Sequence, residues 1–357
     1  MAMNSNYSVV YLLILVSISE SNSENSALLS VVQVFRHGFR TPIIFYPTDP
    51  YQDKKYWNGL GPGELTDSGK IQLHNLGSYF RKMYHDFLPQ TYNESSILIK
   101  SDKNKRNILS AIAFMQGLYP NLDRNISIDI SDWSVLGTLV SCLKFDFHYI
   151  VTETTDKYFR EVNKENRETY RYIRRHTLMP TYELLTAFTV WDTLYVESLV
   201  NLKLPEWTQK VFPEALAEVS KNMALSICYT EKEQIIGAGP FLNELIQHFD
   251  CIVQNCSSKR EIVLYSGHDV NIACFLNTFG VFETLSPEMP PFASSLIFEM
   301  RKIEDSHIIN GYYKPQDEMI PIKFRGCGYD CALEDFRYIF RNVVINKRKW
   351  LWKCFAI

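Results

Sequence analysis

Short apolar runs that end directly in polar residues constrain the fold of this chain more than any other feature. Leu28 to Phe35 (LLSVVQVF) and Glu261 to Ser266 (EIVLYS) have the apolar, β-branched composition of buried strands, and Ile97 to Ile99 is a shorter run of the same kind. Ligands of open α/β sheets bind at the carboxyl ends of the strands. We therefore expect the groups that follow the three runs to meet at one edge of a sheet. These groups are Arg36-His37, Lys100 with the nearby Arg106, and His268-Asp269.

Helical patterns alternate with these runs at both ends of the chain. Thr66 is suited to cap one helix and either Ser101 or Asp102 to cap a second, and Val270 to Phe279 has the pattern of a third. The alternation predicts an α/β fold with a helix-covered, mostly parallel central sheet. Two further strand candidates are Leu296 to Met300 and His307 to Tyr313.

The middle of the chain changes character. From about Asp132 to Glu233 it is charged, rich in Tyr, Glu, Arg and Lys, and helical in pattern, without a clean strand. We expect a smaller α-helical domain inserted into the α/β domain. The predicted division is a signal peptide at 1–23, an α/β domain formed by 24–131 and 234–357, and the helical insert at 132–233.

The first residues carry the pattern of a secretory address. Val9 to Ile18 is a ten-residue apolar run, too short to span a bilayer, and small polar residues follow it. The usual positive charge before the run is missing, and the alternative is a buried element of the mature fold. No second run is long enough to anchor the mature chain. Three sequons favour a glycosylated protein that is secreted to the extracellular space or delivered to lysosomes. They begin at Asn93, Asn125 and Asn255.

The overall charge argues against some partners. A net charge of −3 gives the surface no broad attraction for nucleic acid or anionic lipid. An anionic substrate would therefore need a local concentration of positive charge.

The segment RHGFRTP, from Arg36 to Pro42, supplies such a concentration. His37 follows a buried strand, so its backbone is held, and Gly38 lets a ligand approach closely. The guanidinium groups of Arg36 and Arg40 match phosphate oxygens and disfavour a charged imidazole, which leaves His37 neutral, as a nucleophile must be. The alternative is an exposed basic turn with a structural histidine.

Two further elements are weaker by themselves. His268-Asp269 ends an apolar run just as Arg36-His37 does, so Asp269 is a candidate general acid and His268 a candidate donor to phosphoryl oxygens. A capping Asp with a hydrogen-bonded His is the alternative. Arg106 is expected in the first turn of a helix, where anions are favoured, and its alternative is a solvated side chain.

Together these motifs resemble the histidine acid phosphatase family, the group of prostatic, lysosomal and insect venom acid phosphatases. The resemblance runs from about Leu28 to Cys354, and its most specific segments are RHGFRTP and YSGHD. Weaker segments are PTDP at Pro47 to Pro50, GELTDSG at Gly63 to Gly69, KSDKNKRNILSA at Lys100 to Ala111, YVESLVNLKLPEW at Tyr195 to Trp207, PPFASS at Pro290 to Ser295 and GCGYDCALEDF at Gly326 to Phe336. Arg40 and Pro42 favour this branch over the related phosphoglycerate mutases.

The resemblance implies an acid phosphatase that hydrolyses phosphate monoesters through a phosphohistidine. His37 would attack phosphorus and Asp269 would protonate the leaving group. The phosphoryl oxygens would be held by Arg36, Arg40, Arg106 and His268. Neither a metal nor another cofactor is implied, because arginines stabilise the charge. The implied substrates are small phosphate monoesters or phosphoproteins, and homodimers are frequent in the family.

The sequence also departs from the family pattern. Phe39 stands where an acidic residue is usual, Lys103 and Lys105 stand where acidic residues often precede the conserved arginine, and Lys100 replaces another arginine. These changes predict a more positive pocket, with a shifted pH optimum or substrate choice.

The cysteines follow the family with one exception. All eight lie after the apolar run, as suits an oxidising compartment. The resemblance implies the disulfides Cys327–Cys331 and Cys142–Cys354. The family's third pair is replaced at both ends, by Val196 and Ser295. The other four are open: Cys251 and Cys256 are a candidate pair, and Cys228 and Cys274 are either paired or buried thiols.

Two other functions compete with a general acid phosphatase. One is a narrower phosphatase for lysophosphatidate or inositol phosphates, which a polybasic substrate rim would favour. The other is a catalytically weak, secreted pseudophosphatase with a binding or allergen-like role, supported only by Phe39 and the lysine substitutions. Hydrolysis of p-nitrophenyl phosphate from pH 4 to 7, with a His37→Ala control, separates these classes.

Overall fold

A single mixed sheet organises the molecule in the computed structural model, which describes residues 26–122, 126–130, 133–136, 142–179, 184–286 and 288–355. The predicted signal peptide therefore lies outside the described residues. The strands are β1 Ser26–Arg36, β2 Ile97–Ser101, β3 Ile128–Asp129, β4 Ile262–Gly267, β5 Ser295–Ile303, β6 Ser306–Lys314, β7 Ile320–Ile322 and β8 Cys331–Ala332. Their order is β3-β2-β4-β1-β5-β6-β7, and β8 pairs with β6.

The sheet has a parallel core and an antiparallel side. β3, β2, β4 and β1 run parallel to one another, as the sequence predicts. β1 pairs antiparallel with β5, which continues into β6, β7 and β8 in the same antiparallel sense. The α/β class is confirmed, and both further strand candidates are strands, β5 and β6.

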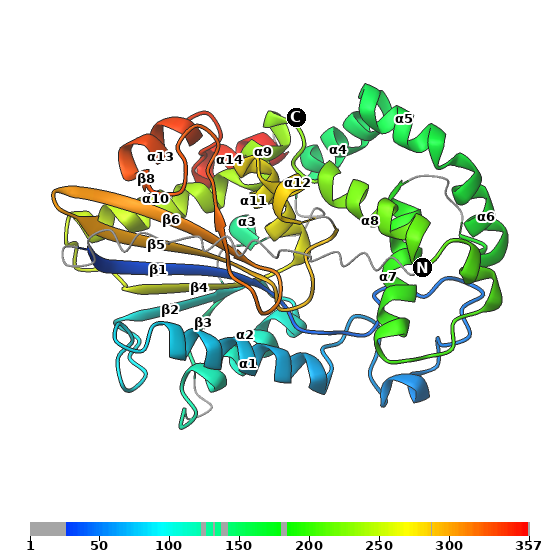
Figure 1. Cartoon of the computed structure of the whole chain (residues 1–357), viewed down its shortest axis with the longest axis horizontal. Helices are drawn as coiled ribbons and strands as arrows, with labels where there is room; N and C mark the ends of the chain where they lie inside the picture. Colours follow the sequence, from blue (N-terminus) through cyan, green and yellow to red (C-terminus); the bar gives the residue numbers. More distant parts are fainter. Residues whose placement is uncertain are drawn as a thin grey trace, which may run out of the picture.

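Helices cover both faces of the sheet (Figure 1). Side chains alternate along β1, so that Val31 and Phe35 face α1 and α2 while Val32 and Val34 face the opposite layer. That opposite layer includes α10, α11 and α13. The helices of the α/β part are α1 Asp67–Met83, α2 Lys105–Leu118, α10 Gly239–Val253, α11 Asp269–Phe279, α12 Phe282–Leu285, α13 Leu333–Phe340 and α14 Lys347–Phe355.

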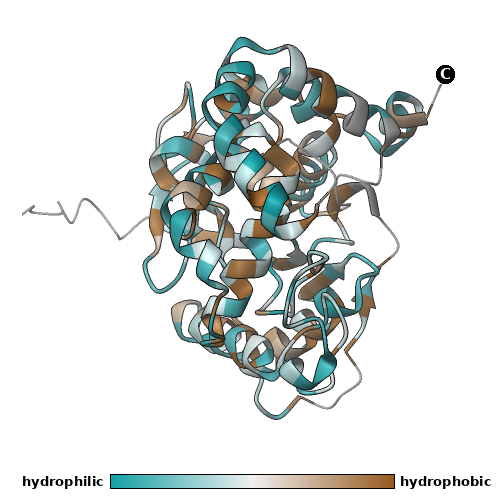
Figure 2. Cartoon of the chain, turned by 90° about the vertical axis from the view of Figure 1, so that its right-hand side faces the viewer, coloured by the Kyte–Doolittle hydropathy of each residue, from teal (hydrophilic) through white to brown (hydrophobic). Residues whose placement is uncertain are grey.

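The segment between β3 and α10 contributes helices and no strand among its described residues. Most of its helices form the lobe at the right of Figure 1, while its first and last helices pack against the α/β part, and Figure 2 shows hydrophilic and hydrophobic bands alternating along its helices. This amphipathic pattern is what a helix needs to pack one face against a core. The helices are α3 Trp133–Leu136, α4 Leu143–Thr155, α5 Lys157–Glu165, α6 Arg167–Thr177, α7 Leu184–Leu199, α8 Glu214–Ser226 and α9 Glu231–Gly237.

Helix starts are only partly predictable. Thr66 caps α1 as expected, since its side chain accepts a hydrogen bond from Gly69 N. The prediction that Ser101 or Asp102 caps α2 is wrong. The N-cap is Asn104, and the Asp102 carboxylate accepts from the backbone N–H of Asn104 and from the side chain of Asn107. No helix in the described part of the chain is long and apolar enough to cross a membrane.

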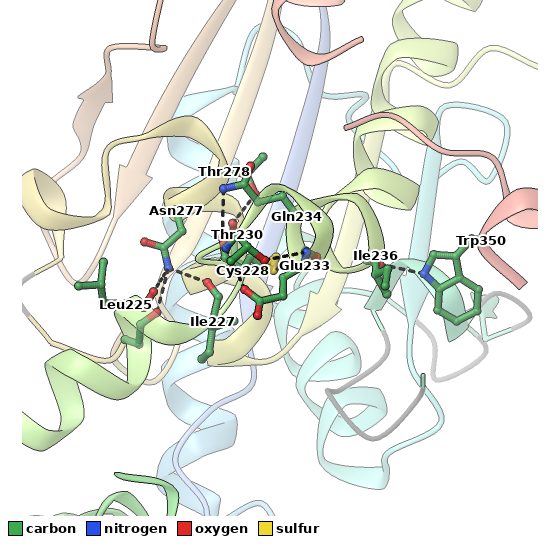
Figure 3. The surroundings of a disulfide bond; sticks show 12 residues. Leu225, Ile227, Cys228, Thr230, Glu233, Gln234, Ile236, Asn277, Thr278 and Trp350 are labelled. Atoms are coloured by element: carbon green, nitrogen blue, oxygen red, sulfur yellow. Dashed lines mark hydrogen bonds between the residues drawn. A yellow bond between two sulfur atoms is a disulfide. The ribbon is translucent and has the colours of Figure 1, made fainter. Parts of the chain in front are cut away.

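Four disulfides are present in the described part of the chain, two between distant segments and two within short loops. Both pairs implied by the family resemblance, Cys142–Cys354 and Cys327–Cys331, are bonded. The candidate pair Cys251–Cys256 is bonded as well. Cys228 and Cys274, whose state the sequence left open, form the fourth disulfide, shown in Figure 3.

The Cys228–Cys274 disulfide positions the site indirectly. It joins the turn after α8 to α11, the helix that begins at Asp269. The side-chain amide of Asn277, also on α11, donates to the carbonyls of Ala224 (2.9 Å) and Ile227 (2.7 Å) at the end of α8. The helical lobe is thus clamped to the element that carries a predicted catalytic carboxylate.

Candidate active site

The three predicted strand ends meet at one edge of the sheet. β4 lies between β2 and β1 and runs parallel to both, so their carboxyl ends point the same way. His37 follows β1, and His268 with Asp269 follows β4. Arg106, in the first turn of α2, arrives just after β2.

The His37 main chain and ring are both fixed. Its N–H donates to the carbonyl of Gly267 (3.0 Å), and its own carbonyl accepts from Ala293 N (3.2 Å). The ring Nδ1 lies 2.9 Å from the carbonyl oxygen of Gly38. Because a carbonyl oxygen only accepts, the ring proton belongs on Nδ1, and Nε2 keeps its lone pair.

The surroundings keep this ring uncharged. Burial lowers the pKa of His37 most, and the positive charges of Arg36 and Arg106 lower it further, with smaller contributions from His268 and Arg40. The pKa therefore lies well below the ordinary histidine value. A neutral imidazole with a free Nε2 lone pair has the electronic state of a nucleophile.

Arg40 is held by a carboxylate from the helical lobe. Its Nη1 and Nη2 donate to Oδ2 (3.0 Å) and Oδ1 (2.9 Å) of Asp192 on α7. A bidentate pair of this kind fixes the plane of the guanidinium group. Sequence reasoning missed Asp192, because nothing in its segment distinguishes it from an exposed aspartate.

Arg36 lies beneath the cavity and contacts the predicted acid. Its Nη2 pairs with Oδ2 of Asp269 (2.6 Å), and its Nη1 donates to the carbonyl of Pro290 (2.6 Å). The guanidinium carbon sits 3.9 Å from the ring centre of Phe292, which also makes an edge contact with Phe39. Phe39 thus belongs to an aromatic wall behind the site, and its side chain is absent from the cavity lining.

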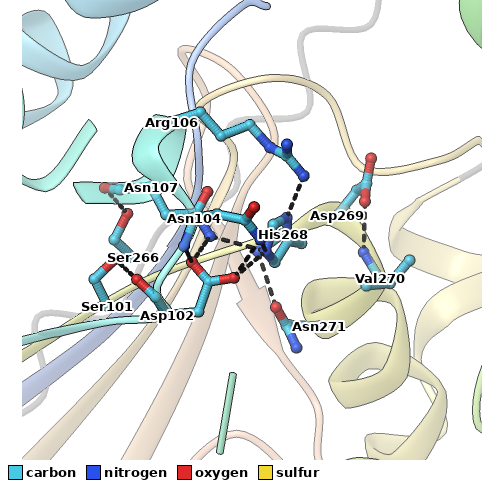
Figure 4. A network of polar contacts seen from close by, with 10 residues as sticks. All are labelled: Ser101, Asp102, Asn104, Arg106, Asn107, Ser266, His268, Asp269, Val270 and Asn271. Atoms are coloured by element: carbon cyan, nitrogen blue, oxygen red, sulfur yellow. Dashed lines mark hydrogen bonds and ion pairs between the residues drawn. The ribbon is translucent and has the colours of Figure 1, made fainter. Parts of the chain in front are cut away.

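His268 is the centre of a polar network (Figure 4). Its Nε2 lies 2.7 Å from Oδ2 of Asp102, whose other oxygen accepts from the Asn107 side chain at 2.7 Å. Its Nδ1 lies 3.5 Å from Nη2 of Arg106. With Nε2–H donating to the carboxylate, Nδ1 is the atom presented to a ligand. Sequence reasoning gave Asp102 only a capping role and so missed this contact.

Three buried donors of the site are unsatisfied within the described part of the chain. The Nε–H groups of Arg36, Arg40 and Arg106 have no hydrogen-bond partner there. Leaving a buried donor unpaired is costly, and guanidinium N–H groups pair well with phosphate oxygens. The site is therefore arranged to gain stability when an oxyanion binds.

Asp269 is negatively charged in the unliganded site. Burial opposes its charge, but the nearby Arg36 and Arg40, together with His268, outweigh burial and lower the pKa of Asp269 below its ordinary value. A backbone hydrogen bond from Val270 N to Oδ1 (2.8 Å) acts in the same direction. A role as general acid therefore requires a proton that arrives with, or because of, the substrate.

A cavity of about 210 Å³ opens over these groups. Five of the six predicted site residues line it, and Arg36 is the sixth, one contact behind Asp269. The polar lining residues are His37, Arg40, Arg106, His268, Asp269, Asp192 and Thr189, and the apolar ones are Ile43, Ile44, Leu185, Phe188 and Val270.

The lysine substitutions do not make the cavity more positive. Lys100 was expected beside Arg106, but its Nζ pairs with Glu244 of α10 (2.8 Å). Ile97 and Ile99 of β2 face α1 and α2, so side-chain alternation sends Lys100 to the other face. Lys105 is 79% exposed and lies 3.7 Å from a Glu64 oxygen. Neither they nor Lys103 line the cavity.

Comparison with known proteins gives the same picture from sequence and from fold. Residues 27–313 match the family model described as "Histidine phosphatase superfamily (branch 2)". Mouse prostatic acid phosphatase is 28% identical over 363 residues, covering 96% of this chain and 93% of that protein. Human lysosomal acid phosphatase is 26% identical over 350 residues, covering 92% of this chain and 80% of that protein.

Among solved structures, the apo form of the Hafnia alvei phytase shares the fold with a TM-score of 0.71. The match covers 91% of this chain and 98% of that one, at 16% sequence identity. At that identity the likeness concerns the fold alone.

Proposed function

The chain belongs to branch 2 of the histidine phosphatase superfamily and is a phosphoric monoester hydrolase, and from this premise we propose that it works through a phosphohistidine on His37. One observation carries the proposal. The ring proton of His37 is placed on Nδ1 by the Gly38 carbonyl, so a neutral Nε2 faces a cavity whose arginines have unsatisfied buried donors.

The proposed first step transfers the phosphoryl group to the enzyme. His37 Nε2 attacks phosphorus while the bond from phosphorus to the ester oxygen breaks. A proton held between substrate and Asp269 passes to that oxygen, and the alcohol leaves. The guanidinium groups and His268 Nδ1 stabilise the phosphoryl oxygens as charge spreads over them.

The second step returns the enzyme to its starting state. Water attacks the phosphohistidine, its proton passes to the Asp269 carboxylate, and the bond between phosphorus and nitrogen breaks. The proton then leaves with the product as dihydrogen phosphate, which restores neutral His37 and ionised Asp269. Asp102 takes part as a positioning residue, because its carboxylate orients the His268 ring and stabilises that ring when both nitrogens carry protons.

Trapping the phosphoenzyme tests this mechanism. After rapid mixing with p-nitrophenyl phosphate and an alkaline quench, peptide mapping should find an acid-labile phosphate on His37. His37→Ala should lose both turnover and label, whereas His85→Ala, at a 69%-exposed histidine outside the cavity lining, should keep both. A label on another residue, or turnover by His37→Ala, would contradict the proposal.

We also propose that the helical insert, residues 132–233, caps the α/β domain and shapes substrate access. Asp192, Phe188 and Leu185 of α7 support this, since they contribute one wall of the cavity. Exchanging the α7 wall should therefore alter substrate choice while leaving the phosphoenzyme on His37.

Secretion, with removal of a signal peptide and N-glycosylation, belongs to the proposal as well. Four disulfides fit an oxidising compartment. Asn93 and Asn255 are exposed, as acceptor sites must be, while Asn125 lies outside the described residues. Expression in a secreting cell should give a medium-borne product whose mass falls on enzymatic deglycosylation, and Asn93→Gln or Asn255→Gln should each remove one step of that fall.

A further inference from the structure

The cavity has two chemically different zones. Its floor carries the arginines, histidines and carboxylates of the proposed mechanism. The five apolar lining side chains are less buried than His37, Arg40 and His268, and we call them the apolar collar: Ile43, Ile44, Leu185, Phe188 and Val270. A phosphoryl group placed at the floor must direct its leaving group into this collar.

The α7 side of the collar leads outward from the floor. Asp192, Phe188 and Leu185 are spaced by four and three residues, so they share one helix face. Asp192 holds Arg40 at the floor, and Leu185, seven residues earlier, lies about 10 Å away along the helix axis. This row of side chains is longer than a phosphoryl group, so an extended alkyl chain can lie along it.

The opposite side of the collar is preformed. The carbonyl of Ile44 accepts a hydrogen bond from Thr193 Oγ1 on α7 (2.7 Å), which fixes the loop to the helix. Nearby, Thr41 Oγ1 donates to the carbonyl of Gly61 (2.6 Å). The side chains of Ile43 and Ile44 nevertheless remain 44% and 50% exposed, and Leu185 is 48% exposed. Anchored backbone with solvent-exposed apolar side chains around a site is typical of a binding surface.

Charge argues against a polar or multiply charged leaving group. The cations that line the cavity, Arg40 and Arg106, are at the floor, where the reacting phosphoryl group needs them. A second phosphate on the leaving group would instead meet apolar side chains, which offer it no cationic partner. Lys105, which precedes Arg106 in the sequence, already pairs with Glu64.

We propose that the apolar collar is the leaving-group subsite and that it selects monoesters with an extended alkyl chain. This inference rests on the proposed function and names its substrate class. The cavity volume is below the 300 Å³ or so typical of a full ligand pocket, so it encloses the phosphoryl group and the first part of the chain only. The remaining methylenes lie along the exposed aliphatic surface of Ile44 and Leu185. Two narrower substrate classes were left open by the sequence. Single-chain lipid phosphates fit this surface, and inositol polyphosphates do not.

The test is kcat/KM for ethyl, butyl, hexyl and octyl phosphate, each below its micelle concentration. A fully buried methylene is worth about fourfold and a half-exposed one about twofold, so octyl phosphate, with six more methylenes, should exceed ethyl phosphate by about 60-fold or more. In the Ile44→Ser/Leu185→Ser variant the rise from ethyl to octyl phosphate should fall to a few-fold. The matched control is Ile71→Ser, at a 60%-exposed isoleucine of α1, and it should keep the full rise.

The outcomes separate this inference from the proposed function. Inhibition by the matching alkylphosphonates, or their direct binding by calorimetry, reports on the collar even without turnover. Failure to hydrolyse ethyl phosphate or to label His37 would refute the proposed function. Normal ethyl phosphate turnover with no chain-length effect, an unchanged effect in the double variant, or a higher kcat/KM for inositol hexakisphosphate than for octyl phosphate would overturn the collar assignment.

Discussion

A buried pair of carboxyl groups predicts one contribution to stability that is larger in acid than at neutral pH. Glu197 of α7 is fully buried, and the charge of Asp49 of the PTDP segment, which is 5% exposed, acts on it. Two buried carboxylates near each other repel, so one of the two groups keeps a proton well above its ordinary pKa. Burial first, and then the charge of Asp49, raise the pKa of Glu197 far above its ordinary value, and burial also raises that of Asp49.

The size of the effect follows from proton linkage. In the unfolded chain Glu197 loses its proton at about pH 4.3, whereas in the folded protein it keeps that proton well above this pH. Between the two values the folded state binds one more proton, so the free energy of unfolding falls by about 1.4 kcal/mol for each unit of rising pH. From pH 5 to pH 7 the loss from this one group is therefore about 2.7 kcal/mol.

Urea unfolding of the wild type and Glu197→Gln at pH 5, 6 and 7 measures this contribution. The amide carries no charge at any of these pH values, so the variant should gain about 2–3 kcal/mol relative to wild type between pH 5 and 7. Val190→Ala, a buried truncation on the same helix, should cost the same at every pH. Parallel pH curves for the wild type and Glu197→Gln would refute a protonated Glu197 in the folded protein.

Three further predictions concern the groups that hold the site together. Asp102→Asn should lower kcat/KM about 10- to 100-fold, because the carboxylate that orients the His268 ring is lost; Asp102→Glu, which keeps a carboxylate, should recover part of the loss, and no recovery would exclude this positioning role. Asp192→Asn should lower the free energy of unfolding by about 2–4 kcal/mol, measured by thermal unfolding. Inorganic phosphate should raise the Tm of the variant more than that of the wild type, since it gives Arg40 a new anion. Replacing Cys228 and Cys274 together by serine should cost about 4 kcal/mol for a 46-residue separation, measured by urea unfolding, while activity at 25 °C persists; equal midpoints would exclude a stabilising bond.

Local patterns were sufficient to predict the strand ends and the residues that follow them. β1 and β4 are contiguous apolar runs, so their boundaries and the polar residues beyond them are visible in the sequence itself. Their parallel pairing follows from the alternation with helices. The antiparallel direction of β5 was not predictable, because it depends on the path taken between α12 and β5 rather than on composition.

Contacts between distant segments were the part that local patterns could not supply. Asp192 meets Arg40 across 152 positions, and no property of its own helix announces that partner. Asp102 was expected to satisfy the backbone of α2, but a buried histidine competes for a carboxylate more strongly than an N-terminal N–H does. Lys100 does not reach the site for a simpler reason. Its neighbours Ile97 and Ile99 are buried on one face of β2, so side-chain alternation places Lys100 on the other face.

The charge on Asp269 shows where the proton for the leaving group comes from. Arg36, 2.6 Å away, keeps this carboxylate ionised in the free enzyme. The second pKa of a phosphate monoester is about 6, so in acid the ester binds as a monoanion that carries one proton. A bound monoanion beside ionised Asp269 has the same composition as a bound dianion beside protonated Asp269, so the substrate can bring the proton that the carboxylate then hands to the ester oxygen. Activity should therefore decline as the pH rises through the second pKa of the substrate, and an ester with a lower second pKa should shift that decline downward by the same amount. A decline fixed at one pH for all esters would place the controlling proton on the enzyme instead.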